Sequence, residues 1–187
     1  MKLKKLLVLV VLLSLWGGTM MLADAASQRV KVIVNGSELS ESGLLEENKT
    51  YLPLRQIAGT LQSLISWDDS TGKVTLNKPN VHMFLFKDTT VFGKVNKGSK
   101  VTFSAWAQVD SLFTDISAFK IVIAGSDGKE ELIQSQEVTS QKDNFWFRTK
   151  EVRYQFDSEG NYPVRMYMKP SGSDEWNLVS EKLIIAE

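Results

Sequence analysis

The stretch 101–109, VTFSAWAQV, decides the fold class of most of this chain. Its odd positions are all apolar, while its even positions hold Thr102, Ser104, Trp106 and Gln108, and this period of two is typical of a half-buried β-strand. Further segments with a strand-like pattern, separated by turn residues, lie at 81–86, 119–123, 132–138, 145–156, 162–168 and 176–185. About seven strands with no amphipathic helix between them predict an antiparallel two-sheet sandwich over residues 81–187.

A tyrosine near the end of the chain refines this prediction. Gly160-Asn161-Tyr162 enters a late strand and resembles the tyrosine corner of immunoglobulin-like (Ig-like) sandwiches, in which the phenol hydrogen-bonds to upstream backbone. The cysteine that often follows two residues later is replaced by Val164, and the chain contains no cysteine at all. We therefore expect an Ig-like sandwich that is held together by apolar packing, without a disulfide.

Residues 26–80 predict a smaller, β-rich domain with one short helix. A β-branched strand at 30–34 ends at Asn35-Gly36, a dipeptide that favours a tight hairpin turn. A further turn is expected at 48–50. Pro53 suits the first turn of a helix, and apolar residues at 54, 57, 58 and 61 predict an amphipathic helix over 54–62. Strands at 64–67 and 74–76 then flank a turn at 68–72, giving a second hairpin.

The order of these motifs resembles the copper amine oxidase-like N-terminal domain, also called the stalk domain, which recurs in exported proteins of Gram-positive bacteria. The matching segments are VNG at 34–36, YLPLRQIA at 51–58, SWD at 66–68 and GKVTL at 72–76. The family-motif residues, for which the resemblance implies a structural role, are Asn35, Gly36, Pro53, Leu54, Arg55, Trp67 and Asp68. Gln62-Ser63 replaces a Leu-Gly pair that is usual in the family, so the turn after the helix is expected to differ. The resemblance implies a structural module without catalytic residues.

The first 25 residues have the pattern of a secretory signal peptide. Lysines at 2, 4 and 5 precede an apolar run at 6–16, and Ala23-Asp24-Ala25 is a small-x-small cleavage motif before Ala26. The alternative, a membrane-spanning helix, needs about 20 apolar residues, and this run is shorter. We expect cleavage between Ala25 and Ala26, a mature chain without a membrane span, and a secreted or extracellular protein associated with the cell surface.

Composition excludes several kinds of chemistry. The 22 basic and 22 acidic residues balance, which gives no basis for nucleic-acid binding. Copper amine oxidase chemistry needs three histidine ligands, whereas this chain has His82 alone. Asp127-Gly128 and the segment Asp157–Gly160 lack the ligand spacing of a calcium loop, so we expect them to form turns. The sequence therefore predicts no cofactor, no metal and no catalytic residue.

Three large aromatic residues stand out as candidates for a ligand surface. Trp106, Trp146 and Tyr167 each alternate with apolar neighbours, so we expect them on outward faces, where they could stack on sugar or contact a partner. Between the two interpretations, packing between domains or in the core is favoured over an exposed binding surface. The apolar parity also changes between Phe147 and Val152, which predicts a β-bulge.

These observations favour an exported bacterial structural or binding protein without catalytic activity, whose stalk module presents an Ig-like interaction domain. The first alternative is a module that binds cell-wall glycan through the three aromatic residues. The second is a hydrolase that uses two carboxylates. The sequence leaves open the partner, whether protein or cell-wall glycan, and the oligomeric state.

Overall fold

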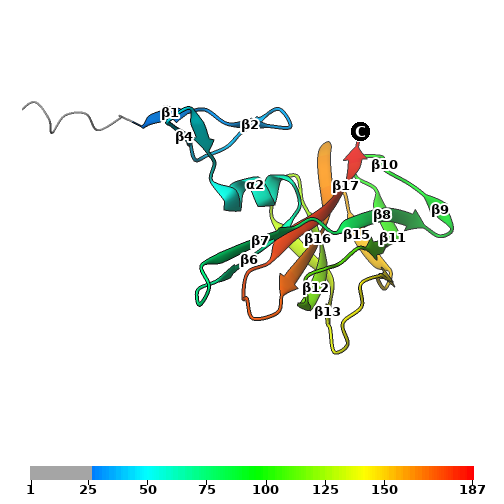
Figure 1. The fold of residues 1–187 in the computed structure, drawn as a ribbon. Coiled ribbons are helices and arrows are strands. Elements are labelled where there is room, and N and C mark those ends of the chain that lie inside the picture. The colour runs from blue at the N-terminus through cyan, green and yellow to red at the C-terminus, as the bar shows by residue number, and fades with distance from the viewer. Residues whose placement is uncertain (1–26) are drawn as a thin grey trace, which may run out of the picture. The chain divides into compact units, whose positions relative to one another are not determined.

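The computed structural model describes residues 27–187 and divides the chain into two compact units at Pro53–Leu54 (Figure 1). The predicted signal peptide and its cleavage site at Ala25–Ala26 lie outside the described residues. The mainly β fold predicted from the sequence is confirmed, with one short helix among the described residues.

The first unit consists of short strands. One antiparallel sheet has the order β1 (Gln28–Val30), β4 (Gly43–Glu46), β5 (Lys49–Tyr51), and a separate hairpin joins β2 (Ile33–Val34) to β3 (Ser37–Glu38). Asn35 and Gly36 form the predicted tight turn, with φ angles of 52° and 81°. The turn expected at 48–50 lies one residue earlier, because Glu47 and Asn48 take the positive φ angles and Lys49 already belongs to β5.

The second unit begins with helix α2 (Leu54–Thr60), followed by the hairpin of β6 (Leu64–Asp68) and β7 (Lys73–Asn77). The helix ends two residues before the predicted limit, because Gln62 has a left-handed φ of 56°. The Ser63 amide donates to the Ala58 carbonyl at 2.8 Å and the Gln62 amide donates to the Gly59 carbonyl at 3.1 Å. These two bonds define a Schellman turn. Gln62 takes its left-handed position, which in helices generally is most often held by glycine.

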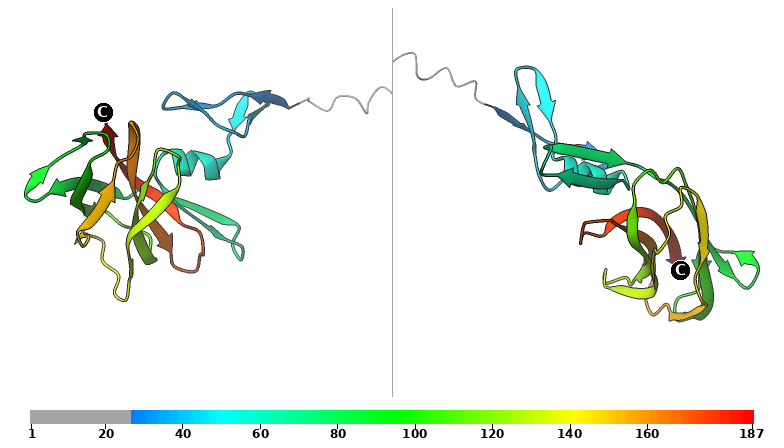
Figure 2. Two further views of the ribbon diagram at one scale, coloured as in Figure 1. Left: turned by 180° about the vertical axis from the view of Figure 1, so that it is seen from behind. Right: turned by 60° about the horizontal axis from the view of Figure 1, so that its bottom comes forward.

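Two five-stranded sheets follow, with the pairing order of an immunoglobulin-like sandwich (Figures 1 and 2). The first sheet has the order β10 (Lys94–Val95), β17 (Asn177–Ala186), β16 (Gly160–Pro170), β12 (Ile116–Ala124), β13 (Glu130–Glu137). The second sheet has the order β14 (Phe145–Arg148), β11 (Lys100–Asp110), β8 (Asn80–Lys87), β9 (Thr90–Val91), and β15 (Val152–Gln155) also pairs with β11. Only the pairing of β10 with β17 is parallel within these two sheets.

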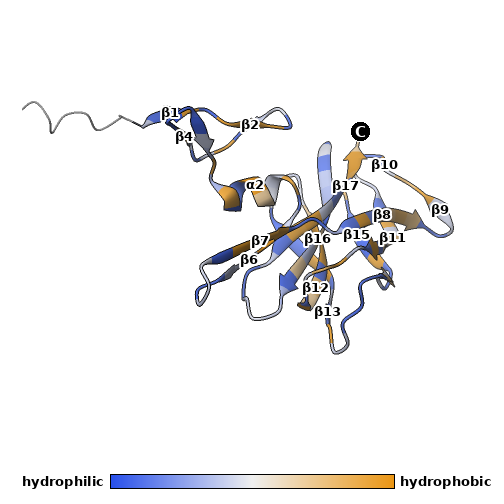
Figure 3. Cartoon of the chain, in the orientation of Figure 1, coloured by the Kyte–Doolittle hydropathy of each residue, from blue (hydrophilic) through white to orange (hydrophobic). Residues whose placement is uncertain are grey.

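The core lies between the two sheets, where alternate side chains of β11 and β16 meet. Phe103, Ala105, Ala107 and Val109 point inward from β11, and Val164 and its apolar neighbours point inward from β16. Figure 3 shows the alternation along the strands and the strongly apolar colouring of β8. Burial of apolar surface stabilises a fold by about 25 cal/mol per Å². In a domain without disulfides this burial is the main stabilising contribution.

The predicted tyrosine corner is present. The Tyr162 hydroxyl donates to the Ser158 carbonyl at 2.8 Å and accepts a hydrogen bond from the Ser158 amide at 3.0 Å. The buried Tyr162 ring also packs edge-on against Phe156, with 5.0 Å between centroids. These contacts fasten the turn before β16 to the core.

The predicted β-bulge is also present, between β14 and β15. Arg148 pairs with Trp106 of β11, but Val152 pairs with Phe103, so one extra residue stands on the β14–β15 side. Thr149 occupies the bulge; its amide donates to the Ala105 carbonyl and its hydroxyl accepts from the Ala105 amide. The bulge keeps Phe147 and Val152 both toward the core, as the change of parity predicts.

Helix α2 and the β6–β7 hairpin belong to the same compact unit as the sandwich. Leu64 of β6 is buried in the same apolar cluster as Leu85 and Ile184, and the hairpin lies beside β16 and β17 (Figures 1 and 2). The boundary between the two compact units therefore lies after Pro53. The sequence-based boundary at residue 80, between the predicted domains 26–80 and 81–187, stays a prediction.

Candidate functional site

An aromatic face covers the outer side of the second sheet. We define it by Phe84 of β8, Trp106 of β11 and Trp146 of β14, whose strands are hydrogen-bonded neighbours. Trp106 pairs directly with Phe84, and their rings lie 5.8 Å apart at a tilt of 32°. Trp146 pairs with Gln108, so it is the diagonal neighbour of Trp106. The register of three strands thus brings three rings to one surface.

The rings differ in how much of each is exposed. The Trp146 side chain stands out of the edge strand with 70% of its surface exposed, and Phe84 is 39% exposed. Trp106 is half-buried between them because β11 lies inside the sheet. An indole exposed to this extent costs free energy in water, since burying a large apolar side chain is worth roughly 1.5–3 kcal/mol. A rigid half-buried ring beside a freely exposed one is therefore an arrangement suited to contact with a ligand.

Trp146 lines three hollows, and two of them also have Trp106 as a wall. The first hollow has a volume of about 410 Å³ and is lined by Phe86, Asp88, Thr89, Trp106, Trp146 and Arg148. The second hollow has a volume of about 300 Å³ and is lined by Trp106, Gln108, Asp110, Asn144, Phe145 and Trp146. The β8–β9 hairpin, which stands out from the sandwich in every view of Figures 1 and 2, carries Asp88 and Thr89 at its turn.

Polar side chains in the hollows are held by neighbours. The Arg148 Nε donates to the buried Ser104 hydroxyl at 3.2 Å, which fixes the guanidinium beside Trp106. In the second hollow the Gln108 amide nitrogen donates to Asp110 at 3.0 Å. The Asn144 side-chain oxygen accepts from the Ser111 amide at 3.0 Å. Planar hydrogen-bonding groups thus stand at fixed positions around the indole faces.

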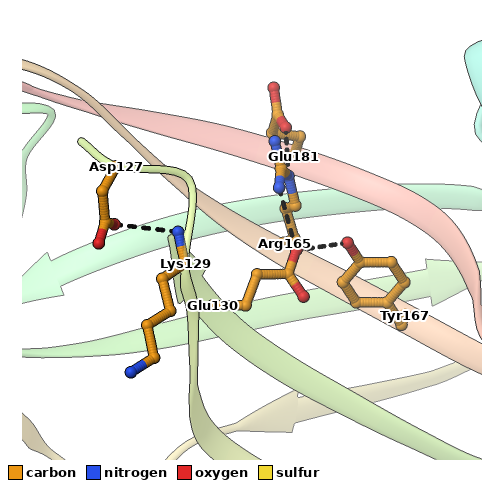
Figure 4. Close-up of polar contacts among 6 residues, drawn as sticks. All are labelled: Asp127, Lys129, Glu130, Arg165, Tyr167 and Glu181. Carbon is orange, nitrogen blue, oxygen red and sulfur yellow. Dashed lines mark hydrogen bonds and ion pairs between the residues drawn. The ribbon is translucent and has the colours of Figure 1, made fainter. Parts of the chain in front are cut away.

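Tyr167 does not join the aromatic face, because it lies on β16 in the first sheet (Figure 4). Its hydroxyl donates to Glu130 at 2.6 Å, and Glu130 also accepts from Arg165 Nη1 at 3.0 Å. Arg165 Nε donates to Glu181 at 2.7 Å, which completes a chain of polar contacts across β13, β16 and β17. The Lys120 ammonium lies 5.2 Å from the centre of the Tyr167 ring. The structure thus brings Trp106 and Trp146 together and places Tyr167 in a separate network.

The pKa values of this network reflect these contacts. Burial and the hydrogen bond to Glu130 raise the pKa of Tyr167 to about 12. Burial opposes ionisation of Glu130, but the hydrogen bonds from Tyr167 and Arg165 outweigh it and lower the pKa of that carboxyl. Burial likewise opposes the charge on Arg165, yet bonds to Glu181 and Glu130 raise its pKa further. Each shift favours the protonation state that keeps the network intact at neutral pH.

Three of the family-motif residues, Arg55, Trp67 and Asp68, make local polar contacts. Asp68 accepts hydrogen bonds from the hydroxyls of Ser70 and Thr71, each at 2.6 Å, and these bonds lower its pKa to about 2. The Trp67 indole nitrogen donates to Asp69, so the exposed ring is tied to its own turn. Arg55 forms an ion pair with Glu175 in the loop before β17. Asp68 therefore caps the hairpin turn, as its position before Ser70 and Thr71 predicts.

Copper chemistry does not fit the residues present. His82 is the one histidine of the chain; it is exposed on β8 and pairs across the sheet with Gln108. Within residues 27–187 no group of three histidine, cysteine, aspartate or glutamate side chains is arranged to hold a metal ion. In the same part of the chain, no helix has the length and hydropathy needed to cross a membrane.

The geometry defines a β-sandwich with an aromatic outer face, preceded by a smaller β-rich unit. Residues 33–110 match the family model of the copper amine oxidase N-terminal domain, which confirms the resemblance noted from the motifs. The match covers the N-terminal domain alone and no catalytic domain, and it runs through β8 and β11 of the sandwich. No curated protein matches the chain.

Sequence reasoning missed several residues around Trp106. Phe84 and Phe86 lie in the unbroken apolar run 83–86, where no polar alternation shows which side chains point outward. Asp88 and Thr89 form an ordinary hairpin turn whose place beside Trp146 follows only from the strand order. Arg148 is different, because it stands two residues after Trp146 and the alternation of the strand already places it on the same face.

Proposed function

We propose that this chain is an exported bacterial binding protein without catalytic activity, in which the aromatic face of the sandwich is the ligand surface. Export rests on the signal-peptide pattern of residues 1–25. A structural rather than catalytic role for the N-terminal region agrees with the match to a non-catalytic domain. We infer localisation at the cell surface or in the medium from the signal-peptide pattern.

One observation carries the proposal of binding. Trp146 exposes 70% of its surface beside the hollows on the same face as Trp106. Intramolecular contacts engage the Tyr167 hydroxyl, and Trp67 is tied to its turn. Exposed aromatic clusters with a polar rim mark binding surfaces on soluble proteins.

The two-carboxylate hydrolase is the weaker alternative. A separate hollow of about 340 Å³ is lined by Asp127, Glu130 and Glu131, which are the acidic side chains such an enzyme would need. A glycosidase acid requires a raised pKa, whereas the pKa of Glu130 is lowered by Tyr167 and Arg165. Asp127 accepts a bond from the Lys129 amide at 3.0 Å and belongs to a turn (Figure 4).

The test is binding of the full chain to isolated Gram-positive cell walls and to the surface proteins of the producing cell. We expect Trp146→Ala to reduce retention at least tenfold. Phe113→Ala is the matched control, because Phe113 is 79% exposed and lines none of the three hollows that Trp146 lines. Equal retention of wild type, Trp146→Ala and Phe113→Ala would contradict the proposal.

A further inference from the structure

Building on the proposed function, we infer that the aromatic face binds an uncharged glycan, with one sugar ring in each of the two hollows that Trp106 and Trp146 both line. The shape of the surface is the first observation that supports a glycan. Ligand pockets for small molecules have volumes of roughly 300–1,000 Å³, and the hollows of about 410 and 300 Å³ lie at the lower end of that range. Two small adjoining hollows suit repeating units better than one large ligand.

The walls of each hollow match the two surfaces of a sugar. A pyranose ring has an apolar C–H face and a rim of hydroxyl groups. Trp106 and Trp146 line both hollows and offer apolar ring faces. The rim of the first hollow carries Arg148 and Asp88, and that of the second carries the Gln108 and Asn144 amides with Asp110. These planar groups donate and accept hydrogen bonds, as hydroxyl groups require.

Charge argues for an uncharged polymer. In the first hollow the charges of Arg148 and Asp88 offset each other, and the second hollow has Asp110 as its charged group. A polyanion such as nucleic acid or a sulfated glycan would meet one cation and two carboxylates along this surface, which is unfavourable. A neutral glycan encounters no such repulsion.

The arrangement also fits a glycan better than a protein partner. A stable protein interface buries about 800 Å² on each side around an apolar centre. Here polar side chains and the two indoles line the same hollows, so no wide apolar centre is available to a protein partner. Trp106 is supported by the tilted Phe84 ring and by Arg148, which Ser104 holds. Such a rigid floor reduces the ordering cost of binding a flexible chain.

The test is calorimetric titration of the full-length protein with chitohexaose, cellohexaose and heparin. The first two probes share the uncharged pyranose face and distinguish an amino-sugar polymer from a glucose polymer; heparin is the polyanionic control. We expect one neutral oligosaccharide to bind and heparin not to bind. Trp146→Ala should weaken that binding at least tenfold, and Phe113→Ala should leave it unchanged.

Two conservative variants test the two subsites separately. Asp88→Asn keeps a side chain that tolerates the φ of 55° at this turn, and Asp110→Asn removes one charge from the second hollow. Each variant should weaken hexaose binding severalfold. A disaccharide fills a single hollow, so at least one of the two variants should weaken disaccharide binding less than it weakens hexaose binding. Equal effects of both variants on both lengths would overturn the two-subsite arrangement.

The outcomes separate this inference from the proposed function. If no neutral oligosaccharide binds, yet cell walls or a surface protein are retained in a manner that depends on Trp146, the glycan inference is wrong and the binding surface stands. If heparin binds more tightly than either neutral probe, the charge argument is wrong. If Trp146→Ala changes no binding of any kind, both proposals fail.

Discussion

The two outer faces of the sandwich carry similar residues but use them differently. On the second sheet, Trp146 and Phe84 remain exposed beside Arg148, and hollows open around them. On the first sheet, Tyr167 donates to Glu130, while Lys120 lies over both the Tyr167 ring and the Trp176 ring, at 5.2 and 4.6 Å. The cross-strand neighbours of an outward aromatic residue therefore decide whether its ring stays free for a ligand or is held by contacts within the protein.

The largest expected effect is on the free face. In the double variant Trp106→Phe/Trp146→Ala the fold should persist, since Phe preserves an apolar ring at the half-buried position. Binding to the ligand of the protein should fall about 100-fold, which corresponds to roughly 2.7 kcal/mol. Urea unfolding of the same variant should show a change of about 1 kcal/mol or less. A loss of stability larger than the loss of binding would show that these rings are structural.

The network face should respond in the opposite way. Arg165 bridges Glu130 and Glu181, and its removal leaves two partly buried carboxylates without their cation. We expect Arg165→Met to lower the free energy of unfolding by about 1–2 kcal/mol, as measured by urea denaturation. Binding at the aromatic face should not change. A binding defect in Arg165→Met as large as that of Trp146→Ala would erase the distinction between the faces.

The pH dependence of stability gives a smaller effect. The pKa of Tyr167 is raised to about 12 in the folded chain, so its contribution is fully present below pH 10 and is lost as pH rises from 10 toward 12. Glu130 has a lowered pKa, so its contribution is present at neutral pH and is lost at acidic pH. Thermal unfolding of wild type and Tyr167→Phe should therefore differ most at neutral pH and converge above pH 12. A constant difference between them across this alkaline range would contradict the network.

The smallest effect is expected for an exposed apolar residue that lies in neither arrangement. Leu132 on β13 is 58% exposed on the first sheet and does not line the hollows beside Trp146. Leu132→Ala should change stability by less than about 0.5 kcal/mol and leave binding unchanged, by urea denaturation and calorimetry. A clear binding defect in this variant would mean that the ligand surface extends to the first sheet.

The sequence was sufficient for the local structure of the sandwich. Strict alternation at 101–109 predicts β11. The change of parity between Phe147 and Val152 predicts a bulge, which the structure places at Thr149. The Gly-x-Tyr pattern predicts the hydrogen bonds of Tyr162 to Ser158. These features depend on contacts between residues that are close in the chain or on the period of one strand.

The composition of the site depends on strand order, which alternation does not encode. Trp106, Trp146 and Tyr167 have the same local signal, yet β11 and β14 are neighbours while β16 lies in the other sheet. The pairing of Trp106 with Phe84 also requires the register between β8 and β11, and the run 83–86 is apolar on both sides. Nonlocal pairing therefore decided which candidates form one surface.

The most direct test of the account is a map of amide chemical-shift changes in the full-length protein during titration with the neutral oligosaccharide that binds. We expect the changes to cluster on β8, β11 and β14 and at the Asp88–Thr89 turn, while Lys120, Arg165 and Tyr167 stay unperturbed. Changes confined to β12, β16 and β17 would contradict the assignment of the aromatic face as the ligand surface.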